Sequence, residues 1–199
     1  MPLALKQIWW VKLAIWYALP LLWQYMVLSI ARHVFGAEEP TENGFSSGVA
    51  MGGVGMAIYC FAPIVMSVVF PYLIPRLGTR KIWFLSLLVG GFGFVAFQLT
   101  ESLTVIFLLC FLIGIGYSGI VTMPYMMLAR VVPEERVGVY MGLLNSFICI
   151  PQIVSMLTVP FYYDALLKGD PRNALLVAGV FWLIAGFLVL RITKNCLEL

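Results

Sequence analysis

Long apolar runs separated by short polar breaks dominate the chain. A helix that crosses the hydrocarbon core of a bilayer needs about 20 mainly apolar residues. Six runs of about that length occur near residues 8–31, 50–74, 82–99, 103–128, 137–160 and 174–192. The breaks between them contain Gly, Pro and charged residues, which are typical of helix ends. The pattern therefore predicts an all-α membrane protein, with six transmembrane helices in a single domain over residues 1–199.

The composition agrees with a protein whose solvent is the lipid bilayer. Apolar residues make up 62% of the chain and charged residues only 11%, whereas soluble domains have about 45–50% and about 25%. The net charge of +3 is small and its basic residues are scattered among short loops. A nucleic-acid partner is therefore not expected, because such partners need a concentrated basic surface.

The distribution of Lys and Arg predicts the orientation of the helices. With the N-terminus inside the cell, nine basic residues lie on the cytoplasmic side: Lys6, Lys12, Arg76, Arg80, Lys81, Arg130, Arg136, Arg191 and Lys194. Only Arg32, Lys168 and Arg172 lie on the outer side. Cytoplasmic loops of membrane proteins carry the excess of positive charge. We therefore expect both termini in the cytoplasm.

No span contains a pattern of catalytic or metal-binding residues. Neither a Ser/His pair, an HExxH motif nor a pair of Asp residues occurs in any run, so we do not expect an enzyme. Cys60, Cys110 and Cys149 lack the spacing of metal ligands, and we expect them to be small buried side chains without a cofactor or metal. His33 follows Arg32 at the outer end of the first run, with no carboxylate nearby that would suit a proton relay.

The fifth run carries two amides on one helical face. Asn145, Cys149 and Gln152 recur at positions i, i+4 and i+7, so they share one side of a helix. Amides are costly in lipid and must face another helix or water. They therefore either line a path for a hydroxyl-rich ligand or hydrogen-bond one helix to another, and the residues alone leave both interpretations open.

The fourth and first runs add further polar and aromatic candidates. Gly114, Ser118 and Thr122 form a pattern of small residues, which favours close helix packing for Gly114 and leaves Thr122 open. Tyr125 and Gln24 could add to the polar wall of a sugar site, because such sites combine hydrogen-bonding side chains with flat rings.

The loop after the second run carries the first recognisable motif. Its sequence is Pro71-Tyr-Leu-Ile-Pro75-Arg76-Leu-Gly78-Thr-Arg80-Lys81. It resembles the loop between the second and third helices of a major facilitator superfamily half. That motif normally begins with Gly and has Asp before the Arg. Pro71 and Pro75 occupy these places here, as in the degenerate copy of C-terminal halves.

A more specific resemblance lies in the fourth and fifth runs. Its residues are Met123-Pro124-Tyr125, the segment from Arg136 to Asn145, and Ile150-Pro151-Gln152. They resemble the corresponding helices in the C-terminal half of the sucrose and disaccharide proton symporters. The opening Lys6-Gln-Ile-Trp-Trp-Val also resembles the start of the seventh helix in that family.

This resemblance implies a function for the chain. Members of the family have twelve helices, a central sugar site between two six-helix halves, and proton coupling by an acid mostly in the first half. The chain is therefore expected to be one half of a sugar proton symporter in the plasma membrane. The expected substrate-binding residues are Asn145, Gln152, Gln24 and Tyr125. The alternatives are a homodimeric six-helix sugar facilitator and a membrane scaffold without transport.

Overall fold

A computed structural model describes residues 3–130 and 132–192, and these residues form six long helices without a strand. The helices are α1 (Leu3–Phe35), α2 (Phe45–Leu77), α3 (Thr79–Ala96), α4 (Leu103–Ala129), α5 (Val137–Leu167) and α6 (Pro171–Leu190). Two short 3-10 turns, η1 (Phe97–Leu99) and η2 (Glu134–Arg136), precede α4 and α5. All six long helices have the length and apolar character needed to cross a membrane. The prediction of an all-α membrane protein is confirmed.

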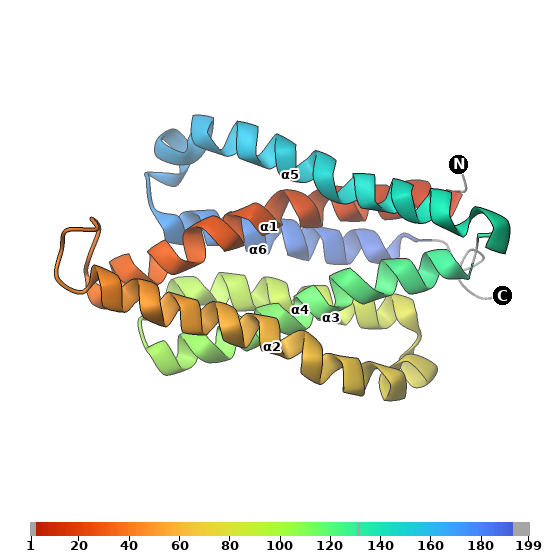
Figure 1. Ribbon diagram of the computed structural model, residues 1–199, viewed down its shortest axis with the longest axis horizontal. Coiled ribbons are helices and arrows are strands. Elements are labelled where there is room, and N and C mark those ends of the chain that lie inside the picture. Colours follow the sequence, from red (N-terminus) through yellow and green to blue (C-terminus); the bar gives the residue numbers. More distant parts are fainter. Residues whose placement is uncertain (1–2, 131, 193–199) are drawn as a thin grey trace.

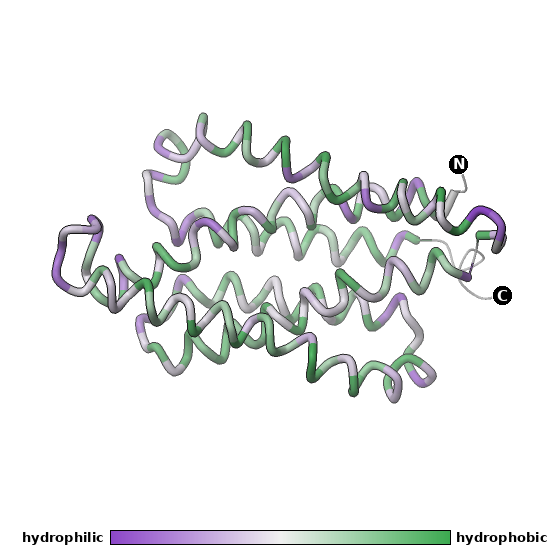
Figure 2. Tube along the Cα trace, in the orientation of Figure 1, coloured by the Kyte–Doolittle hydropathy of each residue, from purple (hydrophilic) through white to green (hydrophobic). Residues whose placement is uncertain are grey.

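The helices lie side by side and run alternately in opposite directions (Figure 1). We call the end where α1 begins and α6 ends the terminal end, and the other the opposite end. Neighbouring helices form a ring in the order α1, α6, α3, α4 and α2, which closes because α2 also packs against α1. The fifth helix, α5, packs mainly against α1. Hydrophilic positions gather near the two ends of the bundle (Figure 2).

Small residues let the ring helices approach each other closely. A methyl group added at Gly114 of α4 would lie 2.4 Å from the carbonyl oxygen of Tyr59 and 2.6 Å from Cβ of Ala62, both on α2. No side chain fits in that space. The packing role expected for Gly114 is confirmed.

Two helices remain largely uncovered. In the most apolar stretch of α5 only 17% of the residues are buried, and in α2 only 22%, against 44% or more in the other four helices. The expectation of buried cysteines is accordingly wrong for two residues. Cys110 on α4 is buried, whereas Cys60 on α2 and Cys149 on α5 are exposed. The helix faces that carry Cys60 and Cys149 have no partner among the described residues.

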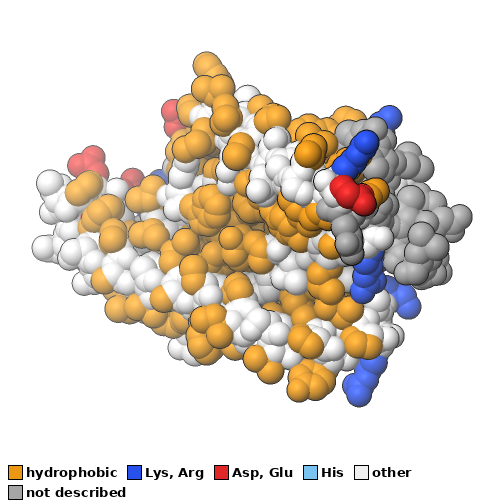
Figure 3. All heavy atoms as spheres, turned by 45° about the vertical axis from the view of Figure 1, so that its right-hand side comes forward, with side chains coloured by type: hydrophobic (Ala, Val, Ile, Leu, Met, Phe, Trp, Pro, Cys, Tyr) orange, Lys and Arg blue, Asp and Glu red, His pale blue; other side chains and the backbone are white. Residues whose placement is uncertain are grey.

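The structure also corrects one member of the basic set. Lys12 lies inside α1 with none of its surface exposed, so it does not belong among the charges at the membrane surface. Lys194 lies outside the described residues. The other seven residues of the set occupy helix ends and turns at the terminal end: Lys6, Arg76, Arg80, Lys81, Arg130, Arg136 and Arg191. Lys and Arg side chains gather at this end of the surface, and apolar side chains cover its middle (Figure 3).

Candidate functional site

A hydrogen bond joins two of the four expected site residues. The hydroxyl of Tyr125 on α4 donates to Oδ1 of Asn145 on α5 over 2.6 Å. Tyr125 is half-buried and Asn145 is exposed. The pair therefore forms a polar contact between two helices that otherwise touch little, and the Asn145 amide still has free hydrogen-bonding capacity at the surface.

The other two expected residues stand apart from this pair. Gln152 is half-buried, about two turns farther along α5, and Gln24 is exposed on α1. Within the described part of the chain neither side chain makes a hydrogen bond. Their amides are thus unpaired among the described residues, and no hydrogen bond links them to Tyr125 or Asn145.

Sequence reasoning missed a charged residue beside the pair. The ammonium of Lys12 donates to the carbonyl oxygen of Leu144 over 3.0 Å. Its Nζ lies 5.0 Å from the ring centroid of Tyr125 and 5.9 Å from that of Trp16, within the range of cation–π attraction. The signal was available, because residue 12 falls inside the apolar run 8–31 rather than before it.

A second polar contact holds α5 to α1. The hydroxyl of Tyr17 lies 2.8 Å from Oγ1 of Thr158 and 3.0 Å from the hydroxyl of Tyr162. The ring of Tyr17 also stacks on Phe181 of α6, with the centroids 5.0 Å apart. Together with Lys12, these bonds fix α5 against α1 on both sides of its middle, although α5 buries little apolar surface.

A hollow of about 420 Å³ lies between α2 and α4 toward the terminal end. Its lining is Ser67, Phe70, Pro71, Ile74, Pro75, Thr122 and Met126. Most of these side chains are apolar. Thr122, whose role the sequence left open, therefore lies beside α2 and offers a hydroxyl at the wall of a mainly apolar groove.

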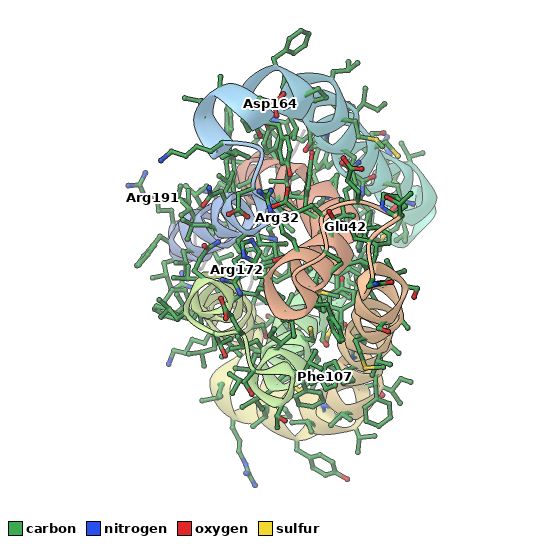
Figure 4. The ribbon with its side chains drawn as sticks, turned by 90° about the vertical axis from the view of Figure 1, so that its left-hand side faces the viewer. Arg32, Glu42, Phe107, Asp164, Arg172 and Arg191 are labelled. Atoms are coloured by element: carbon green, nitrogen blue, oxygen red, sulfur yellow. The ribbon has the colours of Figure 1, made fainter. Side chains whose placement is uncertain are left out.

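The opposite end carries a cluster of charged residues. Nε2 of His33 at the end of α1 lies 2.8 Å from Oδ1 of Asp170, in the α5–α6 loop. Arg32 donates to the carbonyl oxygen of Gly169 over 2.9 Å and pairs with Glu38 at 2.9 Å. Arg32 and Arg172 both lie near the middle of this end (Figure 4). His33 thus has a carboxylate partner, which the sequence did not reveal because the two residues are 137 positions apart.

Asp170 has two roles in this cluster. It is the N-cap of α6, where its carboxylate accepts the backbone N–H of Arg172 over 2.8 Å. Partial burial by itself raises the pKa of the Asp170 carboxyl, but the hydrogen bonds from His33 and from the Arg172 backbone, with the charges of His33 and Arg32, hold that pKa below its usual value. The folded protein therefore favours the ionised carboxylate.

We expect acid to weaken the folded chain partly through Asp170. The pKa of the Asp170 carboxyl is lower in the folded than in the unfolded chain. Its contribution to the free energy of unfolding is therefore complete above the unfolded pKa of about 3.9, and it is lost as the pH falls through the folded pKa. Melting in detergent from pH 7 to pH 3 should fall less steeply for Asp170→Asn. At pH 7, Asp170→Ala should cost about 1 kcal/mol through the lost helix cap, whereas Asn retains a cap. Equal slopes for wild type and Asp170→Asn would contradict this role.

Comparisons with known proteins agree with this architecture. Proton-associated sugar transporter A of Homo sapiens is 36% identical over 84 residues, which are 42% of this chain and 11% of that protein. The Mus musculus protein of the same name matches to the same extent. Solute carrier family 45 member 3 of Mus musculus is 23% identical over 143 residues, covering 69% of this chain and 26% of that protein. The matched region thus spans about a quarter or less of these relatives.

The family profile described as Major Facilitator Superfamily matches residues 11–195. This range begins within α1, extends past the end of α6 and therefore includes nearly all of the six-helix bundle. The chain is similar in part to a protein named as a sugar transporter, and it belongs to the major facilitator superfamily.

Proposed function

We propose that the chain is one six-helix half of a sugar proton symporter and that the exposed side of α5 faces the substrate path. The observation that carries the proposal is the exposed amide of Asn145, which is bonded to Tyr125. Asn145 lies on α5, the helix that the rest of the chain covers least. An amide in that position is costly against hydrocarbon. A water-filled path bounded by a second half removes that cost.

The remaining surface supports this assignment of faces. The large exposed side chains of α6 are all apolar: Val180, Ile184, Phe187 and Leu190. This face suits lipid. The uncovered part of α5 also carries many apolar side chains, but unlike that of α6 it includes the polar residues Asn145 and Ser146. The difference favours lipid around α6 and a second half opposite α5.

The chemistry of the exposed groups suits a hydroxyl-rich solute such as a disaccharide. Gln24, Gln152 and Asn145 offer amides that both donate and accept hydrogen bonds. Trp23, which is 41% exposed beside Gln24, offers a flat apolar ring for the carbon face of a pyranose. The name of one relative, proton-associated sugar transporter A, points in the same direction.

Proton coupling requires an acid, and the described residues place none in the middle of the bundle. The acidic side chains that the structure describes lie in loops or near helix ends: Glu38, Glu39, Glu42, Glu101, Glu135, Asp164 and Asp170. A second copy of the chain would add no central acid either. The proposal therefore favours a different second half, which supplies the proton acceptor, over a homodimer.

The same proposal includes orientation and location. Seven basic residues lie at the terminal end against Arg32, Lys168 and Arg172 at the other, and the side with the excess is usually cytoplasmic. We place both termini in the cytoplasm and the protein in the plasma membrane. A terminal tag that antibodies reach from outside intact cells would contradict this orientation.

Transport by the native protein tests the proposed function. The protein should be isolated from its own cells through a tag on this chain, together with whatever is bound to it, and reconstituted into vesicles. We expect an inward proton gradient to drive accumulation of a labelled disaccharide, and a protonophore to abolish it. Uptake that only equalises across the membrane would indicate a facilitator instead. Vesicles without sugar uptake would indicate a scaffold or another substrate and would overturn the proposal.

A further inference from the structure

We infer that Lys12 is a positioning residue that makes Asn145 present its amide NH2 group, rather than its oxygen, to the substrate path. This inference rests on the proposed sugar site and goes beyond it, because it assigns a hydrogen-bonding direction to that site. Lys12 itself is fully buried and acts through Tyr125 and Asn145 rather than by touching the substrate.

The position of Lys12 in α1 is unusual for a lysine. It lies seven residues from Leu19, the midpoint of α1, which at 1.5 Å per residue is about 10 Å. The hydrocarbon core extends about 15 Å from its centre, so Lys12 falls inside it. A lysine at such a depth usually extends its ammonium to the nearby membrane surface. Lys12 instead points into the bundle, toward α4 and α5.

The contacts of Lys12 converge on the Tyr125–Asn145 pair. Its ammonium bonds to the carbonyl oxygen of Leu144, the residue directly before Asn145. It also lies 5.0 Å from the centroid of the Tyr125 ring. Lys12 therefore fixes the backbone that carries the amide and the ring that carries the hydroxyl, which are the two ends of one hydrogen bond.

The protonated form of Lys12 favours one direction of that bond. A cation near the face of a phenol ring draws electron density toward itself, so the hydroxyl becomes a better donor and a poorer acceptor. Tyr125 then donates to Asn145, as the structure shows. Because the amide oxygen is held by Tyr125, the NH2 group of Asn145 is left for a ligand, and it can only donate. The NH2 group binds a sugar oxygen through its lone pairs.

The test compares Lys12→Met with Lys12→Arg in the native transporter, each in the wild-type and the Tyr125→Phe background. We expect Lys12→Met to raise the KM for sugar uptake roughly fivefold to tenfold, with Lys12→Arg restoring much of the affinity because it keeps the charge. In the Tyr125→Phe background, which lacks the hydroxyl, Lys12→Met should raise KM no further. A purely structural lysine would instead change KM equally in both backgrounds, and that result would overturn the inference.

A second measurement keeps this inference separate from the sugar proposal. The melting temperatures of wild type, Lys12→Met, Tyr125→Phe and the double variant in detergent give the coupling between Lys12 and Tyr125 without any substrate. If wild-type protein takes up no sugar, the proposed function fails, and the melting cycle still reports the contact. If the effects of Lys12→Met and Tyr125→Phe on the melting temperature are additive, Lys12 does not position Tyr125. A wild-type KM in folded Lys12→Met would lead to the same conclusion.

Discussion

Replacing Asn145 by alanine is expected to raise the KM for sugar uptake roughly tenfold to hundredfold, while the amount of protein in the membrane stays nearly unchanged. A site built around a hydrogen bond loses about 1–3 kcal/mol when one partner is removed, because the bound sugar displaces water and its hydroxyl is then left unpaired. Asn145 is exposed on α5 and bonds only to the Tyr125 hydroxyl among the described residues. Its truncation therefore removes little packing within this chain.

The neighbouring Ser146 supplies a matched control. It is also exposed on α5, but its hydroxyl donates to the carbonyl oxygen of Gly142 in its own helix over 3.2 Å. Ser146→Ala should leave KM close to wild type. Gln152→Ala should resemble Asn145→Ala, because both amides lie on one stripe of α5. Wild-type KM in both amide variants, together with lower melting temperatures, would show that these amides only hold helices together.

The membrane fold could be predicted from the sequence because the bilayer imposes a simple rule. Each crossing needs about 20 apolar residues with satisfied backbone groups, so six runs predict six helices before any packing is known. The helical face shared by Asn145 and Gln152 could also be predicted from the sequence, because the helical period alone places the two residues together. The close approach at Gly114 followed from a pattern of small residues four apart.

Contacts between distant parts of the chain could not be predicted in this way. Lys12 bonds to a residue 132 positions away, and His33 to one 137 positions away. No local pattern encodes which helices become neighbours, so the place of Lys12 inside an apolar run could indicate burial but not its partners. The bond from Tyr125 to Asn145 was hidden for the same reason, although both residues were expected at the site. The exposure of Cys60 and Cys149 depends on which helices this chain leaves uncovered.

A tight three-helix junction lies where α3, α4 and α6 meet. Trp182 of α6 is fully buried, and its ring contacts Phe94 of α3 edge to face, with the centroids 5.0 Å apart. A methyl group added at Gly116 of α4 would lie 2.6 Å from Cζ3 of Trp182, 2.9 Å from Cα of Gly90 and 3.0 Å from the carbonyl oxygen of Ser86. Two of these three atoms belong to the α3 backbone, so moving a side chain cannot remove the conflict.

Gly116→Val is therefore expected to destabilise the chain by about 3 kcal/mol or more, which is the upper end of the range for overpacked protein cores. Little folded protein should remain after extraction into detergent. Gly53→Val is the matched control. Gly53 lies in the first third of α2, and no atom lies within 4 Å of a methyl group added there. The same β-branched side chain should therefore cost only its small helix preference. Size-exclusion profiles and melting temperatures of the two variants measure the difference. If Gly116→Val folds and melts like Gly53→Val, α3, α4 and α6 do not meet as closely as the structure indicates.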